Sequence, residues 1–479
     1  MSISRRRVLT GLGAAAAGAA LGLLIRIRGA RGGGEIKAKR VVIVSIAGGL
    51  RLSESLGMAQ GATMPNLLGQ IPILAGGGDA PAGPPVIAPE YAAAAPALVT
   101  PPPLAVPLLE RGALVTNLRY AEGAPGHLQG AACLVSGAYN NIDNRADARA
   151  PAPTLFELHR RATNAPATDA WYVSVVGGFY RALQSSAHPE FGARFGASWL
   201  SPSAVMSIAV PIVGSGQRSI DLTTATGLPI IVDPPEEAAA ARRLAAILDG
   251  NSPTYGEDGR FRATPQENAS LEEHLAALYA DPTYEALFPQ SFGIGMSRPG
   301  GGIDATADGI TTYHAEEILR RYKPAVMLVS LIDIDACHDD FNAYLRAQTL
   351  ADACVSHLWS MIESTDGLAG ETALLVLPEH GRQLNFNGKG TDSLGRSGLD
   401  HGGGDDGDRE AWLLALGPDF KPGVYSPTGV QQAGRASGRY ETIDAVMTAA
   451  SILGQSEVMR QGLVDLGMRP GLLIEDILR

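Results

Sequence analysis

The chain has 479 residues and a formal net charge of −11, with 45% hydrophobic and 18% charged residues. This composition is typical of a globular chain that can bury a large core, and it excludes an intrinsically disordered one. The negative charge, with no basic stripe beyond the N-terminus, argues against binding to nucleic-acid phosphates. We therefore expect no nucleic-acid partner.

The first thirty residues have the pattern of an export signal. Arg5-Arg6-Arg7 precede an Ala- and Gly-rich apolar stretch from Gly11 to Ile25. Paired arginines before so short a stretch predict a twin-arginine signal over residues 1–30, and about 15 such residues fall short of a membrane span. We expect a periplasmic or extracellular protein whose partner during export is the twin-arginine translocase. A signal that is not cleaved would leave the chain peripherally associated with the membrane.

Short apolar runs bounded by Gly and Pro recur along the chain and alternate with helical patterns. The predicted strands are 41–46, 113–117, 171–176, 326–332, 373–377 and 411–416. The predicted helices are 127–135, 154–161, 235–248, 271–279, 313–321 and 342–362. This alternation predicts an α/β fold with a central, mostly parallel sheet flanked by helices.

One α/β domain over residues 38–455 accounts for these elements. Residues 70–110 are dominated by Ala, Pro and Gly, which predicts a loop insertion at the surface. Residues 200–300 contain few strand patterns and several breaks, and we interpret them as a cap-like insertion. Residues 456–479 are expected to form a C-terminal tail that packs on the core.

Acidic residues and histidines follow two of the predicted strands, and a further histidine is flanked by glycines. The candidates are Asp333, Asp335, His338, Glu379, His380 and His401. In parallel sheets, ligands bind outside the carboxyl ends of the strands. Carboxylates and imidazoles delivered there by separate strands suit a divalent cation with mixed oxygen and nitrogen ligands. For each residue taken singly, the alternative is a turn or helix-capping role.

The three cysteines do not form a disulfide framework, since their number is odd. Cys337 is adjacent to His338, so a thiolate ligand is one interpretation. The other, which we favour, is a buried and inert thiol.

Five segments, in chain order, resemble the alkaline phosphatase and sulfatase superfamily, in particular a twin-arginine-exported bacterial branch of uncharacterised proteins. The first resembles the family's first strand, the second its Thr-x-Pro-Asn turn, and the third the segment that follows the nucleophile. The fourth comprises the ligand segments, and the fifth resembles the closing helix. These segments are residues 41–51, 61–67, 127–137, 333–401 and 442–454.

The resemblance implies an exported hydrolase of phosphate or sulfate esters that acts on a small-molecule or glycan ester with one or two divalent cations, zinc being the expected metal. Carried over by position, Thr63 would be the nucleophile. The first cation would be held by His338, His401 and either Asp335 or Asp333, and the second by Glu379 and His380.

Two departures from the family pattern weaken the second cation site. Where the family's first strand ends in a metal-binding Asp, this chain has Ala47-Gly48-Gly49, so that Gly48 replaces it. Glu379 stands where the family has Asp, on an arm longer by one methylene. Because hard cations depend on carboxylate ligands, the second site is expected to bind less tightly. The alternative function is an exported binding or scaffold protein that kept the fold and lost catalysis.

Three charged residues near these segments have open roles. Glu54 is a candidate replacement for the missing carboxylate, and the alternative is a solvated loop acid. Arg51 and Arg382 are candidates for binding an oxyanion, and the alternative for each is a structural ion pair.

Overall fold

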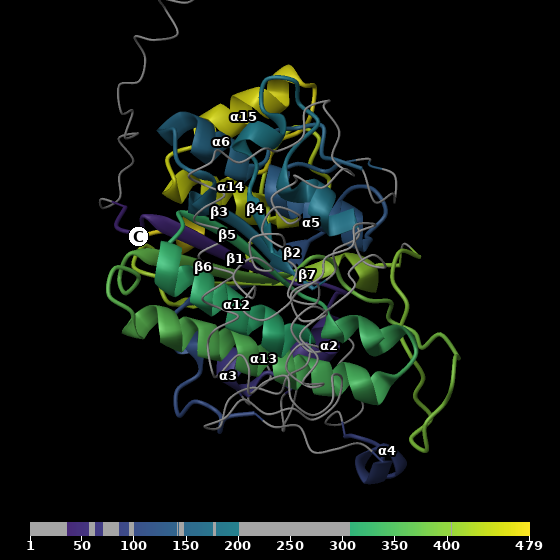
Figure 1. Cartoon of the computed structure of the whole chain (residues 1–479). Helices are drawn as coiled ribbons and strands as arrows, with labels where there is room; N and C mark the ends of the chain where they lie inside the picture. The colour runs from purple at the N-terminus through teal and green to yellow at the C-terminus, as the bar shows by residue number, and fades with distance from the viewer. Residues whose placement is uncertain are drawn as a thin grey trace, which may run out of the picture. The chain divides into compact units, whose positions relative to one another are not determined.

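In the part of the chain that the structure describes, eight strands form one mixed sheet at the centre of the computed structural model (Figure 1). The described residues are 36–56, 63–69, 86–94, 100–140, 142, 148–175, 179–200, 307–403 and 405–479. The strands are β1 (Arg40–Ile46), β2 (Ala113–Arg119), β3 (Ala170–Ser174), β4 (Ser198–Leu200), β5 (Val326–Leu331), β6 (Thr372–Pro378), β7 (Glu410–Leu416) and β8 (Gly423–Tyr425). Their order across the sheet is β4-β3-β5-β1-β6-β7-β2-β8.

The sheet is mostly parallel, as the alternation of strands and helices predicts. β1 pairs in parallel with β5 and β6, β3 pairs in parallel with β4 and β5, and β2 pairs in parallel with β8. β7 runs antiparallel to its neighbours β6 and β2. The last residue of β1, Ile46, lies opposite Leu331 of β5 and Pro378 of β6. The segments that follow these three strands therefore begin at the same edge of the sheet.

Helices cover both faces of the sheet. Figure 1 shows α12 and α13 on one face, with the short α2 and α3, and α5, α6, α14 and α15 on the other. The helices are α2 (Leu52–Ser55), α3 (Pro65–Leu68), α4 (Pro89–Ala94), α5 (His127–Ser136), α6 (Leu155–Thr163), α12 (Ala307–Tyr322), α13 (Phe341–Ser364), α14 (Thr442–Ile452) and α15 (Ser456–Asp465). None of those described is both long enough and apolar enough to cross a membrane.

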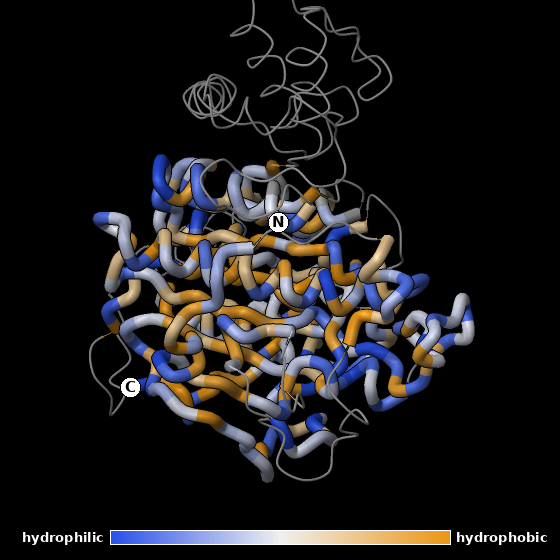
Figure 2. The backbone as a smooth tube through the Cα atoms, turned by 90° about the horizontal axis from the view of Figure 1, so that it is seen from below, coloured by the Kyte–Doolittle hydropathy of each residue, from blue (hydrophilic) through white to orange (hydrophobic). Residues whose placement is uncertain are grey.

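The central strands are buried on both sides because of this double layer of helices. Every residue of β5 and β6 is buried, and in β1 only the first residue, Arg40, is not. Strands covered on both faces need continuous apolar runs, and these three strands consist mainly of Val, Leu and Ile. Figure 2 shows hydrophobic segments running through the interior, with hydrophilic ones gathered along the outer turns.

The predicted elements agree with the structure wherever the structure describes them. All six predicted strands are confirmed to within two residues at each end, and the predicted helices at 127–135, 154–161 and 342–362 are confirmed as α5, α6 and α13. α12 begins at Ala307, six residues before the predicted start at 313. The three-residue strands β4 and β8, at the sheet edges, were not predicted.

Several sequence-based predictions lie outside the described residues. They are the export signal over 1–30, the cap-like insertion over 200–300 and the helices at 235–248 and 271–279. The C-terminal residues, in contrast, are described and lie against the rest of the chain. Met459 and Leu463 of α15 are buried, as is Ile477, whose carbonyl accepts a hydrogen bond from the N–H of Lys421 (2.8 Å).

Candidate metal centre

Four histidine rings meet beyond the carboxyl ends of β5, β1 and β6. His401, in the loop before β7, is at the centre, with its ring centroid 4.3 Å from that of His380, 4.6 Å from that of His127 and 4.7 Å from that of His338. His338 follows β5, His380 follows β6, and His127 is the first residue of α5. The three histidines that the sequence singled out thus lie together, and His127 joins them.

Asp335 lies among three of these rings. Its Oδ2 is 3.2 Å from His127 Nε2, and its Oδ1 is 3.3 Å from His338 Nε2 and 3.7 Å from His401 Nε2. Asp335 and His338 belong to one 3₁₀-helical segment, Asp333–His338. Residues three apart eclipse each other in a 3₁₀-helix, so this local geometry places both side chains on the same side.

Glu379 forms the buried floor of the cluster. Its Oε1 lies 2.6 Å from His127 Nδ1 and 3.4 Å from His380 Nε2, and it accepts a hydrogen bond from the N–H of Gly48 (2.9 Å). The Tyr180 hydroxyl donates to the same carboxylate at 3.2–3.3 Å. Burial alone would raise the pKa of Glu379, but the hydrogen bond from His127 and the nearby ring of His380 lower it to about 2. The residue is therefore a buried anion.

In each of the four histidine rings, Nδ1 faces an oxygen atom that can accept a hydrogen bond. Carboxylate and carbonyl oxygens only accept hydrogen bonds, and in each ring the Nδ1 contact is shorter than the contact of Nε2 with a carboxylate, so these partners favour a proton on every Nδ1. In the neutral ring, Nε2 is then left with a lone pair that faces the cluster, which is the pattern typical of metal-bound histidines. The pairs are His127 with Glu379 Oε1 (2.6 Å), His338 with Asp400 Oδ1 (2.7 Å), His380 with Gly381 O (2.8 Å) and His401 with Pro125 O (3.4 Å).

The cluster attracts positive charge. Burial would raise the pKa of Asp335, but the nearby rings of His127, His338 and His401 hold it well below its usual range. Burial would lower the pKa of His127, but Asp335 and Glu379 raise it to about 10. Burial lowers the pKa of His401 to about 4, against the attraction of Asp335, so this ring is neutral at physiological pH. A cation among these side chains would therefore be strongly stabilised.

Two overlapping sets of ligand atoms fit a divalent cation. Within each set, one nitrogen or oxygen from every member lies within 4.8 Å of the others. The Nε2 atoms of His380 and His401 are buried and have no hydrogen-bond partner among the described residues, so both lone pairs are available. Imidazole-rich sets with a carboxylate suit zinc. The sets are His127, Asp335, His338 and His401, and His127, Glu379 and His380.

The backbone just past β1 leaves no room for a side chain at Gly48. Gly48 has φ +101°, and a Cβ atom there would lie 2.8 Å from the Ile334 side chain and 2.9 Å from Asp335. Such contacts exclude any side chain, including that of Asp. The N–H of Gly48 instead donates to Glu379. The segment after β1 thus contributes a backbone donor that holds the Glu379 carboxylate.

Asp333 faces a different part of the molecule. Its Oδ2 accepts a hydrogen bond from the N–H of Asp308 in α12 (2.9 Å), and Asp308 Oδ1 accepts from the N–H groups of Asp333 (3.1 Å) and Ile332 (2.6 Å). This reciprocal link ties the end of β5 to α12. Of the two aspartates considered from the sequence, the structure places Asp335 in the cluster and Asp333 outside it.

Thr63, the nucleophile implied by the resemblance, is buried against α13. Its Oγ1 lies 2.9 Å from the carbonyl oxygen of Glu54 and 2.5 Å from Gln348 Oε1 of α13. The following turn is fixed to the same helix, because Asp352 accepts hydrogen bonds from Asn66 and from the N–H of Leu67. Among the described residues, the Thr63 hydroxyl is hydrogen-bonded to these two acceptors and not to the histidine cluster.

The contacts of Glu54, Arg51 and Arg382 bear on the two roles that the sequence left open for each of them. Glu54 is 1% exposed and pairs with Arg51, so the interpretation as a solvated loop acid is wrong. Arg51 also donates to the carbonyl of Leu384 (2.5 Å), which makes it a structural ion-pair partner. Arg382 is fully buried and donates to Asp335.

Cys337 is buried too, and burial raises the pKa of its thiol to about 12, as expected of an inert cysteine.

Two residues of the cluster were missed in the sequence. His127 was noted only as part of a family-like segment, because it follows no strand and opens a helix. Asp400 immediately precedes His401, and a carboxylate next to a candidate ligand is a signal for an outer partner of a metal-bound histidine. Asp400 accepts a hydrogen bond from His338 and not from its neighbour His401. Burial would raise the pKa of Asp400, but this hydrogen bond helps to lower it to about 2.

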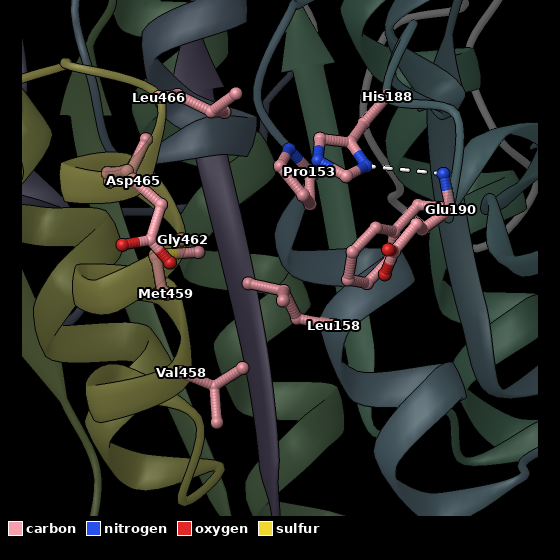
Figure 3. Close-up of a pocket in the computed structure, with 11 residues that line it drawn as sticks. Pro153, Leu158, His188, Glu190, Val458, Met459, Gly462, Asp465 and Leu466 are labelled. Atoms are coloured by element: carbon pink, nitrogen blue, oxygen red, sulfur yellow. Dashed lines mark hydrogen bonds between the residues drawn. The ribbon is translucent and has the colours of Figure 1, made fainter. Parts of the chain in front are cut away.

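A pocket of about 260 Å³ is lined by none of the cluster residues. Figure 3 shows α15, with Val458, Met459 and Asp465, facing His188 and Leu158 across it. His188 Nδ1 accepts a hydrogen bond from the N–H of Glu190 (3.3 Å), and its ring lies against Phe191. His188 thus has a structural role.

The chain is similar to several solved structures, whereas no family model and no curated protein matches it. Alkaline phosphatase PafA has 10% identity and a TM-score of 0.45 over 93% of this chain and 100% of its own. Alkaline phosphatase from the Antarctic bacterium TAB5 has 11% identity and a TM-score of 0.37 over 88% and 99%. A protein in the alkaline phosphatase superfamily from Vibrio parahaemolyticus has 10% identity and a TM-score of 0.39 over 88% and 67%.

Proposed function

We propose that this protein is a metal-dependent hydrolase of phosphate or sulfate esters. The observation that supports the proposal is the cluster itself, in which imidazole nitrogens with available lone pairs surround Asp335 at the carboxyl edge of the sheet. A divalent cation bound there would act as a Lewis acid that polarises the ester and stabilises negative charge on oxygen. Zinc is the proposed metal because nitrogen ligands predominate.

The residues of the chain have distinct parts in this proposal. Asp335, His338 and His401 hold the cation, and Asp400 orients His338 through the hydrogen bond to Nδ1. The side chains of His338 and Asp335 are 31% and 30% exposed, whereas Glu379 is fully buried. The ester, a small molecule or a glycan, therefore approaches from the side of His338 and Asp335.

The proposal is tested by metal analysis of the purified chain together with a screen of nitrophenyl phosphate and nitrophenyl sulfate. We expect bound zinc and turnover of one of the two esters, with activity lost on chelation and regained on adding zinc. The second candidate function, an exported binding or scaffold protein, is favoured by Gly48 in place of a ligand. A chain that binds no metal and hydrolyses neither ester would support that candidate.

Thr63 is the proposed nucleophile, on the strength of the family-like turn. To attack an ester, its hydroxyl would have to leave Gln348 and the Glu54 carbonyl and pass its proton to a base. The matched variants are Thr63→Ser, expected to keep turnover, and Thr63→Ala, expected to lose it while metal content stays unchanged. Turnover by Thr63→Ala at the parent rate would reject this role and leave water as the attacking group.

We also propose export through the twin-arginine translocase to the periplasm or beyond. The support is the charge and hydropathy pattern of residues 1–30. Replacing Arg5 and Arg6 with Lys is expected to retain the full chain in the cytoplasm, as cell fractionation would measure. The control is the same replacement at Arg26 and Arg28, which should leave export intact. Equal export of both variants would contradict the proposal.

A further inference from the structure

The two candidate ligand sets share His127, and the distances decide to which set it belongs. Two ligand atoms of one tetrahedral zinc ion, with bonds of about 2.1 Å, lie about 3.4 Å apart. The Nε2 of His127 is 3.2 Å from Asp335 Oδ2, which is close to this value. Its Nδ1 is 2.6 Å from Glu379 Oε1, which is the length of a hydrogen bond to a carboxylate. A nitrogen that donates its proton in this way cannot also bind a cation.

The other separations agree with one four-ligand site around Asp335. The Nε2 atoms of His338 and His401 lie 3.3 Å and 3.7 Å from Asp335 Oδ1. The Nδ1 atoms of His127, His338 and His401 all face oxygen acceptors, so all three Nε2 atoms point inward. We propose that His127 is the fourth ligand of a single cation, together with Asp335, His338 and His401. This inference rests on the metal binding in the proposed function.

Glu379 then has the role of an orienting acceptor. It is fully buried and accepts hydrogen bonds from His127, from the Gly48 N–H and from the Tyr180 hydroxyl. A carboxylate that serves three donors has little capacity left to bind a cation. Without Glu379 and without the Nδ1 of His127, the second set is reduced to His380. The structure thus gives this second set no function as a separate metal site.

The charges around the cluster also favour one ion. The two positive charges of one divalent cation and that of Arg382 balance the three carboxylates of Asp335, Glu379 and Asp400. Lys389, which is 58% exposed, adds a further positive charge beside Asp400 (3.2 Å). With Lys389 counted, the excess of positive charge is one for a single divalent cation and three for two, and uncompensated charge is costly where it is removed from water.

His127→Ala and His380→Ala form a matched pair that tests the inference. Both histidines belong to the second set, but only His127 also belongs to the first. We expect the parent to bind one zinc ion per chain, His127→Ala to bind it at least about 100-fold more weakly, and His380→Ala to bind it within about threefold of the parent. Elemental analysis and competition with a chromophoric chelator measure stoichiometry and affinity. Glu379→Gln, which keeps an acceptor for His127, should weaken binding by about 10–100-fold without changing the stoichiometry.

The outcomes separate this inference from the proposed function. Two ions in the parent, with one lost from each of the two Ala variants, would overturn the single-ion site and leave the hydrolase proposal standing. One ion that His127→Ala loses, in a parent without ester turnover, would support the inference and reject the hydrolase. A parent that binds no ion would overturn both. Circular dichroism checks folding of His127→Ala, and His127→Gln, which preserves volume, repeats the affinity measurement if the Ala variant does not fold.

Discussion

Replacing His338 or His401 with Ala is expected to remove most of the bound metal and to abolish ester hydrolysis. Each residue directs a lone pair on Nε2 at the cluster, and its Nδ1 is already held by an outer oxygen. Loss of an outer partner alone costs about 10–100-fold in metal affinity, so loss of a ligand should cost at least about 100-fold. Elemental analysis of the purified variants and the nitrophenyl ester assay measure the two effects.

His188→Ala is the control for these two variants, because its ring packs on Phe191 beside the α15 pocket and belongs to neither ligand set. It should keep the parent metal content and rate. His380→Ala should lose little metal, which makes the comparison among histidines specific. If His338→Ala, His401→Ala and His380→Ala all lost the same amount, and the parent held two ions per chain, the predicted asymmetry between the two sets would be wrong.

The fold and most of the cluster were predictable because they follow from local pattern. Continuous apolar runs predict strands buried on both faces, and the parallel arrangement brings the ends of β5, β1 and β6 to one edge. Residues just past those ends, such as His338, Glu379 and His380, then have to lie near one another. This deduction needs no knowledge of loops, because the register of the strands fixes it.

The remaining details depend on geometry that sequence spacing does not specify. Asp333 and Asp335 are equally close to the strand end, and only the 3₁₀ conformation of the segment puts Asp335 on the side of His338. His127 reaches the cluster from the start of α5, on a different layer, so no strand pattern marks it. The hydrogen bond from the Gly48 N–H to Glu379 forms because two segments that are 331 residues apart in the sequence come close together.

Arg382 connects the stability of the chain to its metal content. The side chain is fully buried, donates one hydrogen bond to Asp335 and donates another to the carbonyl of Leu399 (2.6 Å). Arg382→Met keeps much of the volume but leaves the carboxylate and the carbonyl without this donor. Asp335 is 30% exposed, so water replaces part of the lost interaction. Leaving the carboxylate and the carbonyl without this buried donor should cost about 1–3 kcal/mol in urea unfolding of the metal-free chain, measured in excess chelator.

The loss of unfolding free energy caused by Arg382→Met is expected to be smaller when zinc is bound, because the cation then balances the charge of Asp335 in place of the guanidinium. The control is Arg460→Met, whose side chain is 46% exposed and pairs with Glu457, which is 77% exposed. Its cost should be small, with or without zinc, because exposed ion pairs contribute little to stability. A cost for Arg382→Met that equals the control, or that is the same in chelator and in zinc, would contradict this role. Unfolding of the two variants in both conditions therefore measures, independently of any turnover, whether Asp335 binds the cation.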